Sequence, residues 1–337
     1  MIYREKIGKN DHVDASFSFD KTVPSNGYAW WYLDAVSDNG EHALTVIAFV
    51  GSVFSPYYAW ARRRGGANGA GADPNQYCAI NVGLYDLTTT QRHGNYWTMT
   101  ERGAQSVERT AQNFRLGPSA LQWNNGDLVV DINELSAPFP RRVKGRIRLT
   151  PSVDVNATNH SVPIDGADQH FWQPIAPTAR VQVSLDAPNQ HWTGHAYLDS
   201  NYGSAPLESA FRDWQWTRAS LADGSTVVRY DVNLRDGQTV HVARQYASSG
   251  EMSPLKAEAA RSFATTRWGI ARACHSSVAN APTLAASLES GPFYARSLVN
   301  TTWGSEPLIA VHESLSLTRF ANPIVQAMLP FRMPRRA

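Results

Sequence analysis

Cysteine is scarce in this sequence, where only Cys78 and Cys274 occur among 337 residues. The two lie far apart, and neither belongs to a CxxC pair or to a spacing with histidine that is typical of zinc sites. The sequence therefore predicts neither a disulfide framework nor a metal site built on cysteine. So few cysteines fit synthesis for a reducing cytoplasm.

Long hydrophobic runs are also lacking. The longest, residues 43–54, has about 12 residues and is interrupted by Thr45, Gly51 and Ser52, whereas a membrane-spanning helix needs about 20. Residues 1–6 are largely charged, and no apolar segment follows them. We therefore expect neither a membrane span nor a secretory signal peptide.

An excess of charge of one sign is absent as well, because 31 Lys and Arg against 29 Asp and Glu leave a formal net charge of +2. A nearly balanced chain gives no reason to expect a nucleic-acid partner. Aromatic residues are plentiful instead, with 11 Trp, 13 Tyr and 12 Phe in a chain that is 42% hydrophobic. This composition is typical of a globular protein and suits broad apolar cavities.

Three stretches predict β-hairpins, because in each a run of aromatic or β-branched residues leads through a turn containing Gly into a second such run. They are residues 30–50 with a turn at 37–40, residues 121–132 with a turn at 124–127, and residues 214–232 with a turn at 222–225. Few stretches show helical periodicity, and the Gly- and Ala-rich residues 65–73 are expected to form a loop. The rhythm predicts an all-β protein.

The polar segment 151–168 has no aromatic residue and divides the chain into halves of similar length. Trp31-Tyr32-Leu33-Asp34 in the first half is echoed by Ala196-Tyr197-Leu198-Asp199 in the second. We therefore predict two tandem antiparallel β-barrels, residues 1–155 and 156–337, joined at this segment.

Residues 192–203 read as one strand that ends in a turn with Gly203. With a period of two, His195, Tyr197 and Asp199 lie on one face of that strand. His170 and Trp172 are likewise two residues apart on one face of a second segment. If the two faces meet in a cavity, an acid, a phenol, an imidazole and an indole form a site.

Six segments carry a resemblance to a known family. They are residues 26–34 (NGYAWWYLD), 49–58 (FVGSVFSPYY), 99–103 (MTERG), 117–121 (GPSAL), 172–177 (WQPIAP) and 197–201 (YLDSN). Together they resemble the acyclic carotenoid 1,2-hydratases of photosynthetic bacteria, also called hydroxyneurosporene synthases, over roughly residues 14–275. The resemblance implies two lipocalin-like barrels that add water to the terminal double bond of lycopene or neurosporene without a cofactor.

Hydration of such an alkene begins with a proton, which leaves a tertiary carbocation for water to capture. At neutral pH only about one Asp in a thousand is protonated, unless burial raises its pKa from about 3.9. Asp199 matches the Tyr-Leu-Asp-Ser-Asn motif of the family and lies beside aromatic residues, so we expect it to be the proton donor. The alternative is a structural Asp that caps the turn after the strand.

Other residues are expected to assist this acid. Tyr197 shares its strand face, Trp172 presents an indole that could shelter a cation, and His170 could hold the water. An indole is more often core and a strand histidine is more often a satisfied polar residue. As candidate substrate-binding residues the sequence offers Trp31, Tyr32 and His195.

Several other readings remain beside this one. His191 and His195 share a strand face but lack a third ligand, so we expect no metal. A glycosidase needs a second carboxylate paired with Asp199, and its motif offers none. Asp34, the echo of Asp199, is expected to be a structural remnant of duplication. A terpene cyclase that uses the same protonation and a non-catalytic carotenoid or lipid carrier stay open.

A polyene substrate is insoluble in water, so the protein is expected to lie on a membrane surface, on the cytoplasmic side of the inner or photosynthetic membrane. Two segments are candidates for that contact, namely residues 57–64, where aromatic residues precede Arg62, Arg63 and Arg64, and the tail at 324–337. Both combine apolar groups with cations that anionic headgroups attract. Two solvated loose ends are the alternative.

Overall fold

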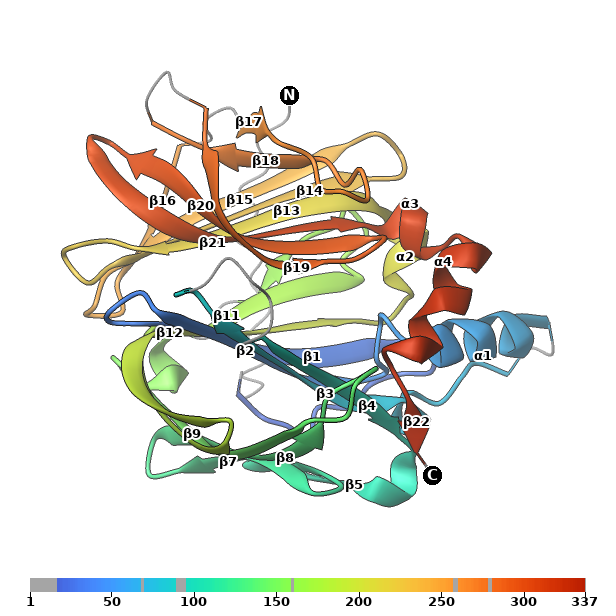
Figure 1. Ribbon diagram of the computed structural model, residues 1–337. Helices are drawn as coiled ribbons and strands as arrows, with labels where there is room; N and C mark the ends of the chain where they lie inside the picture. The colour runs from blue at the N-terminus through green and yellow to red at the C-terminus, as the bar shows by residue number, and fades with distance from the viewer. Residues whose placement is uncertain are drawn as a thin grey trace.

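The computed structural model describes residues 17–67, 70–88, 95–158, 161–256, 260–277 and 281–336. Strands dominate and build two large sheets that lie one above the other, with the few helices gathered at one side (Figure 1). The all-β prediction is confirmed. In the part of the chain so described, no helix is long and apolar enough to cross a membrane.

The first sheet has 13 strands and curls into a half-barrel around a core of its own (Figure 1). Its neighbouring strands are, in order, β22 (Arg335–Arg336), β4 (Tyr96–Arg102), β3 (Cys78–Asp86), β2 (His42–Val50), β1 (Tyr28–Ser37), β12 (Asn189–Gly203), β11 (His170–Ala187), β9 (Arg142–Pro151), β8 (Asp127–Leu135), β7 (Ser119–Asn124), β6 (Asn113–Leu116) and β5 (Val107–Thr110), with β10 (Val162–Pro163) beside β11.

The second sheet has seven strands and is wholly antiparallel. Its order is β16 (Met252–Pro254), β15 (Thr239–Tyr246), β14 (Thr226–Leu234), β13 (Phe211–Ser220), β21 (Glu306–Ser316), β20 (Tyr294–Trp303) and β19 (Thr283–Ser290), while β17 (Ala260–Phe263) and β18 (Arg272–His275) pair separately. The helical segments are α1 (Pro56–Ala67), α2 (Leu207–Ala210), α3 (Leu317–Phe320) and α4 (Pro323–Met328), with short 3₁₀ turns η1 (Pro74–Gln76), η3 (Ala104–Ser106), η4 (Val155–Thr158) and η5 (Leu329–Phe331).

The three predicted hairpins are all present, as β1–β2, β7–β8 and β13–β14. In the second of them the two turn residues Asn125 and Gly126 both have positive φ, at 52° and 86°. That backbone matches the twist of the flanking strands and suits Asn-Gly. The prediction of a loop at residues 65–73 is wrong for its first residues, because helix α1 extends to Ala67.

The long hairpin β11–β12 belongs to the first sheet, and the chain enters the second sheet only after it. Its strand β12 pairs with β1 and its strand β11 pairs with β9, so the hairpin joins the beginning of the first sheet to its end. Residues 170–203 therefore belong to the first sheet, although they follow the segment 151–168. The chain enters the second sheet only after Gly203, at α2 and β13.

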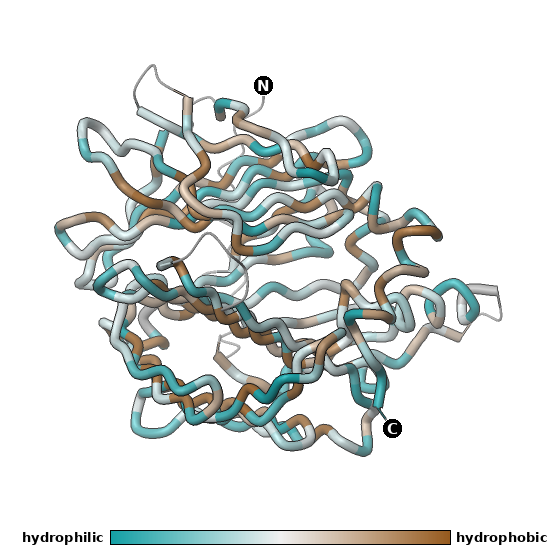
Figure 2. The backbone as a smooth tube through the Cα atoms, viewed as in Figure 1, coloured by the Kyte–Doolittle hydropathy of each residue, from teal (hydrophilic) through white to brown (hydrophobic). Residues whose placement is uncertain are grey.

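The strands of the first sheet divide their side chains between two cores. On β1, Trp31 and Leu33 point into the half-barrel, whereas Trp30 and Tyr32 point toward the second sheet. In Figure 2, hydrophobic residues lie mainly along the strands, and hydrophilic residues are frequent in the turns between them. We call the second core the inter-sheet layer; among its buried aromatic residues are Tyr28, Trp30, Tyr32, Tyr85, Trp172, Tyr197, Phe211, Trp214, Trp216 and Tyr230.

Buried ion pairs cross or border this layer. Arg218 on β13 pairs with Asp34 on β1, and both side chains are at most 3% exposed. Arg296 on β20 lies fully buried and binds Glu289 and Glu313, each at 2.8 Å. Charges removed from water in this way must keep their partners, because an unpaired buried charge is costly.

The Arg218–Asp34 pair gives a direct test of how the sheets are held together. Arg218→Ala should lower the free energy of unfolding by about 3–5 kcal/mol, because it leaves the Asp34 carboxylate buried without its cation. Urea denaturation followed by tryptophan fluorescence measures the change. The double variant Arg218→Met with Asp34→Leu should recover most of the loss, and a single variant within 1 kcal/mol of the parent would contradict a buried pair.

Candidate active site

Asp199 lies on β12 with its side chain in the inter-sheet layer, where the residue is only 2% exposed. Tyr32 on β1 is its direct partner across the strand pair, so the two side chains project from the same face of the sheet. On the other side of β12, the strand β11 is irregular beside the acid, with register shifts between Pro174 and Ala179. Prolines cannot donate to the ladder, and such bulges often border functional sites.

The carboxyl group of Asp199 accepts two strong hydrogen bonds on the same oxygen. Trp172 Nε1 and the Tyr197 hydroxyl each donate to Asp199 Oδ2 at 2.7 Å. The other oxygen, Oδ1, is 3.4 Å from Asn201 Nδ2, which is a weak contact. A proton on this carboxyl therefore belongs on Oδ1, because Oδ2 is already occupied by two donors.

Burial raises the pKa of Asp199 to about 8. Desolvation of the charged form is the main cause, and the hydrogen bonds from Tyr197 and Trp172 act in the opposite direction, since they favour the carboxylate. The nearby carboxylates of Glu313 and Asp34 raise the pKa further. The environment thus holds most of this acid in its protonated form at neutral pH, as the sequence analysis required of a proton donor.

Aromatic rings from both sheets surround the acid. The Tyr197 ring lies 5.4 Å from the Trp216 ring, and the Tyr32 ring lies 5.3 Å from Trp216 and 6.3 Å from Tyr197, measured between centroids. Trp216 is on β13 of the second sheet, and the sequence analysis did not select it. Its alternation with Trp214 marks one face of a hairpin, but no local pattern shows that this face meets β12.

The sequence suggested that the Trp172 ring shelters a cation, but the structure shows it bound to the acid. It is fully buried, and its indole N–H donates a hydrogen bond to the Asp199 carboxyl group. It therefore holds the Asp199 carboxyl group in place, and its hydrogen bond favours the carboxylate form. The rings of Tyr32 and Tyr197 on the first sheet lie together with that of Trp216 on the second sheet beside Asp199.

His170 lies two residues before Trp172, deeper toward the end of the layer at Gly203. Its Nδ1 is 2.9 Å from the Tyr28 hydroxyl, and burial lowers its pKa to about 4, so the ring is neutral at neutral pH. Its Nε2 is buried and has no hydrogen-bond partner among the described residues. An orphaned polar atom of this kind suits an ordered water or a polar ligand.

Two of the predicted substrate-binding residues lie elsewhere. His195 is exposed on β12, four residues before Asp199, with Nε2 3.9 Å from Asp38 Oδ1. Trp31 faces the half-barrel, where its ring packs against Phe19 and Phe114, because it is out of phase with Asp199 in the strand pair. Tyr32 alone of these three joins the site.

The repeated Tyr-Leu-Asp motif lies within one sheet, on two strands that pair with each other. Tyr32-Leu33-Asp34 and Tyr197-Leu198-Asp199 are antiparallel neighbours, with Tyr32 opposite Asp199, Leu33 opposite Leu198 and Asp34 opposite Tyr197. The two motifs thus form one symmetric patch. Asp34 is neutralised by Arg218, whereas Asp199 forms no ion pair within the described residues and accepts hydrogen bonds from neutral donors.

The second sheet also contributes charge that the sequence analysis missed. Glu313 on β21 accepts a hydrogen bond of 2.8 Å from the Tyr32 hydroxyl and is held by Arg296. No motif spacing could have placed it near Asp199, because more than 100 residues separate them in the sequence. Among the described residues, no cluster of three or more His, Cys, Asp or Glu side chains is arranged to hold a metal ion.

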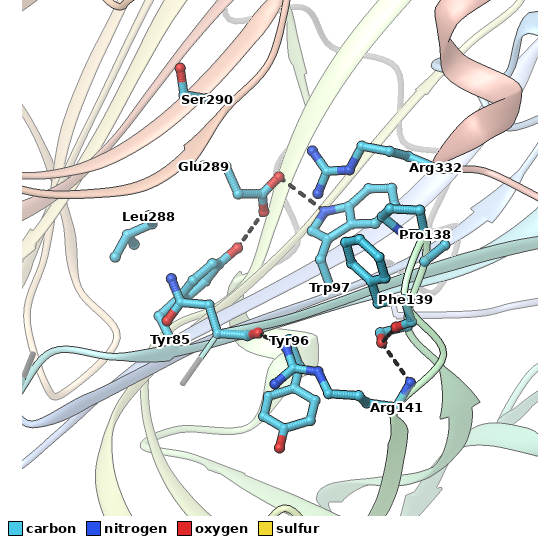
Figure 3. Close-up of a pocket in the computed structure, with 13 residues that line it drawn as sticks. Tyr85, Tyr96, Trp97, Pro138, Phe139, Arg141, Leu288, Glu289, Ser290 and Arg332 are labelled. Carbon is cyan, nitrogen blue, oxygen red and sulfur yellow. Dashed lines mark hydrogen bonds between the residues drawn. The ribbon is translucent and has the colours of Figure 1, made fainter. Parts of the chain in front are cut away.

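Asp199 does not line either of two cavities in the structure. The first is the larger. It has a volume of about 190 Å³ and lies where β3, β4 and the 136–141 turn of the first sheet face the end of β19 (Figure 3). A smaller cavity of about 30 Å³ is lined by Thr217, Ala219 and Cys274, on the other side of the second sheet. The acid is therefore closed off from solvent in this conformation.

Comparison with known proteins gives consistent results. The family model described as carotenoid hydratase CrtC matches residues 46–337. The acyclic carotenoid 1,2-hydratase of Thiocapsa roseopersicina is 48% identical over 94% of this chain and 75% of its own length, and that of Rubrivivax gelatinosus is 45% identical over 95% and 76%. A crystal structure of a candidate AttH protein from Nitrosomonas europaea matches with a TM-score of 0.58 at 15% identity, over 86% of this chain and 92% of that one, which shows the fold.

The raised pKa of Asp199 predicts a pH-dependent stability difference. The folded state binds this proton up to about pH 8 and the unfolded state only below about 3.9, so the parent should lose stability as pH rises between these values, by up to about 1.4 kcal/mol per pH unit. Asp199→Asn keeps an acceptor for Trp172 and Tyr197 and cannot ionise. Its unfolding free energy in urea should exceed that of the parent at pH 8, with a gap that narrows toward pH 4.5. A pH-independent gap would contradict a protonated Asp199.

Proposed function

The chain belongs to the carotenoid hydratase family, and from this premise we propose that it adds water to the terminal C1–C2 double bond of acyclic carotenoids such as lycopene and neurosporene. The observation that carries the proposal is Asp199, a carboxyl group with a pKa of about 8 inside an aromatic layer. An alkene without polar groups offers an enzyme only its π electrons. A desolvated acid that is still protonated at neutral pH is therefore the group that such a reaction needs first.

In the first step, the proton on Asp199 Oδ1 passes to the less substituted carbon of the double bond. The O–H bond breaks, a C–H bond forms from the π electrons, and the neighbouring carbon becomes a tertiary cation. The carboxylate left behind keeps its two hydrogen bonds from Trp172 and Tyr197 at 2.7 Å. These bonds become stronger when their acceptor gains charge, so they favour the transition state over the ground state.

The aromatic rings of the layer then shelter the cation. The rings of Tyr32 and Tyr197 on the first sheet and of Trp216 on the second sheet lie together beside the acid, and a desolvated cation gains about 2 kcal/mol from an aromatic face. The carboxylates of Glu313 and Asp34 are ion-paired but still raise the pKa of Asp199, so they also favour a cation formed beside it.

In the last step, water attacks the tertiary carbon and loses a proton, which returns to the Asp199 carboxylate and restores the acid. We assign the holding of this water to His170, because its buried Nε2 has no partner in the described residues. The neutral imidazole suits this task, since its pKa of about 4 leaves a lone pair or an N–H available without a charge. The route consumes one water and uses no cofactor.

Asp199→Asn should reduce hydration of lycopene by several orders of magnitude, since the amide keeps the size and the hydrogen bonds of the carboxyl but has no acidic proton. Product mass is the readout, because hydration adds one water, whereas cyclisation leaves the mass unchanged and a carrier returns lycopene intact. Trp172→Phe should be milder, because it removes one of the two hydrogen bonds to Asp199 Oδ2 but keeps the acidic proton. An Asp199→Asn protein that hydrates at near the parent rate would refute the assignment.

We further propose that the protein collects its substrate from a membrane surface, on the cytoplasmic side of the inner or photosynthetic membrane. Support comes from the C-terminal segment, where Ile324, Met328 and Phe331 are 73%, 44% and 74% exposed beside several arginines. The helix α1, which contains Arg62, contributes less than its sequence suggests. Arg62 is buried against Glu208 at 2.6 Å, and Arg63 binds Gln326.

The tail therefore makes the better test of membrane binding. Replacing Ile324 and Phe331 together by Ser should weaken pelleting with anionic liposomes by about tenfold or more, because two apolar side chains that would enter the interface are lost. Ile309→Ser, at a residue that is 57% exposed on β21, is the matched control and should pellet like the parent. Equal pelleting of all three proteins would rule out the tail as the contact.

A further inference from the structure

The buried position of Asp199 raises the question of how a long polyene reaches it. The acid lies in the inter-sheet layer and is 2% exposed, and the two cavities described above do not include it among their lining residues. A substrate must therefore enter along the layer from one of its edges.

Of these two cavities, the larger borders that layer. Its lining residues Tyr85 and Leu288 belong to the same buried apolar cluster as Tyr32, Tyr197 and Trp172. The smaller cavity is lined by Thr217 and Ala219, which alternate on β13 with Trp216 and Arg218 and so face away from the acid. The sheet itself separates the smaller cavity from Asp199.

The larger cavity also lies at a suitable distance. Asp199 is opposite Tyr32, Tyr32 opposite Ile47, and Ile47 opposite Asn81 on β3, so three strand spacings separate it from β3, and Tyr85 is four residues further along. With about 4.8 Å per strand and about 3.4 Å per residue, the cavity is roughly 20 Å from the acid. A long polyene can span that distance, whereas a short terpenoid cannot.

The walls of the cavity combine aromatic and polar groups (Figure 3). Phe139 is 79% exposed at the rim and offers an uncharged aromatic surface. The rings of Tyr96 and Trp97 carry the guanidinium groups of Arg141 and Arg332, at 3.9 and 4.2 Å from the ring centroids.

The Glu289 carboxylate in this cavity has several donors. It accepts hydrogen bonds from Trp97 Nε1 at 3.0 Å and from Tyr85 and Arg296. A polyene that passes this carboxylate therefore meets a charge that is already paired.

We propose that this cavity is the mouth through which the acyclic polyene enters the inter-sheet layer, with its reacting end directed to Asp199 and its remaining length in the mouth. The inference rests on the proposed function for the identity of the occupant. It adds an entry site formed by residues of β3, β4, β19 and the 136–141 turn, which lie far from the acid in the sequence.

A removable plug tests the mouth. Phe139→Cys places a thiol at the rim in a chain whose own Cys78 and Cys274 are buried, and that thiol is capped through a disulfide with either a small S-methyl group or a bulky aromatic group. Uptake of lycopene from vesicles is read as polyene absorbance that stays with the protein, and hydration is read as product mass. Ile309→Cys, exposed on β21 outside the cavity, carries the same caps as the matched control.

The bulky cap at position 139 should slow lycopene uptake at least tenfold, the small cap should have little effect, and dithiothreitol should restore the uncapped rate. Ser290→Cys, on the opposite wall, should respond in the same way and covers the case in which Phe139→Cys folds poorly. Uptake that is independent of cap size, or that is slowed equally by a cap at position 309, would refute the proposal that this cavity is the entry site. Size-dependent uptake without any hydrated product would support the mouth and contradict the proposed function.

Discussion

The removal of one carboxyl group from water is the constraint on which the rest of the structure depends. Asp199 is buried between two sheets and forms no ion pair with any described residue, and its pKa of about 8 follows from that burial. A chain that needed only stability would place a neutral residue there or pair the acid with arginine. The neighbouring Asp34 has that pairing with Arg218. One strand pair thus contains the same residue type in a functional and in a structural environment.

The two-sheet arrangement supplies that environment. The long hairpin β11–β12 brings Trp172, Tyr197 and Asp199 onto the outer face of the first sheet, between β1 and β9. The second sheet then covers this face with Trp216, Arg218 and Glu313. The half-barrel core and the inter-sheet layer are separate, so the first can be packed for stability while the second keeps the polar groups that its chemistry requires.

Much of this could be predicted from the sequence, because strand periodicity is local. The hairpins followed from their turns, and the shared face of Tyr197 and Asp199 followed from a period of two. Strand spacing selected His170 and Trp172, and the family resemblance supported Trp172, but neither gave their contacts. What could not be predicted depends on pairing between distant strands, which sequence spacing does not encode. Trp31 and His195 were assigned to the site without knowledge of phase and depth, and Trp216 and Glu313 were missed because their sheet meets β12 only in three dimensions.

The unequal hydrogen bonding of the Asp199 carboxyl has a stereochemical consequence. Trp172 and Tyr197 both bind Oδ2 and so fix the plane of the carboxyl group, which leaves Oδ1 as the single origin of the proton. The two sheets confine a flat polyene to the plane of the layer, so that only one face of its double bond can turn toward that oxygen. Proton transfer in the proposed reaction is therefore stereospecific, and in heavy water the new CHD centre would form with one configuration.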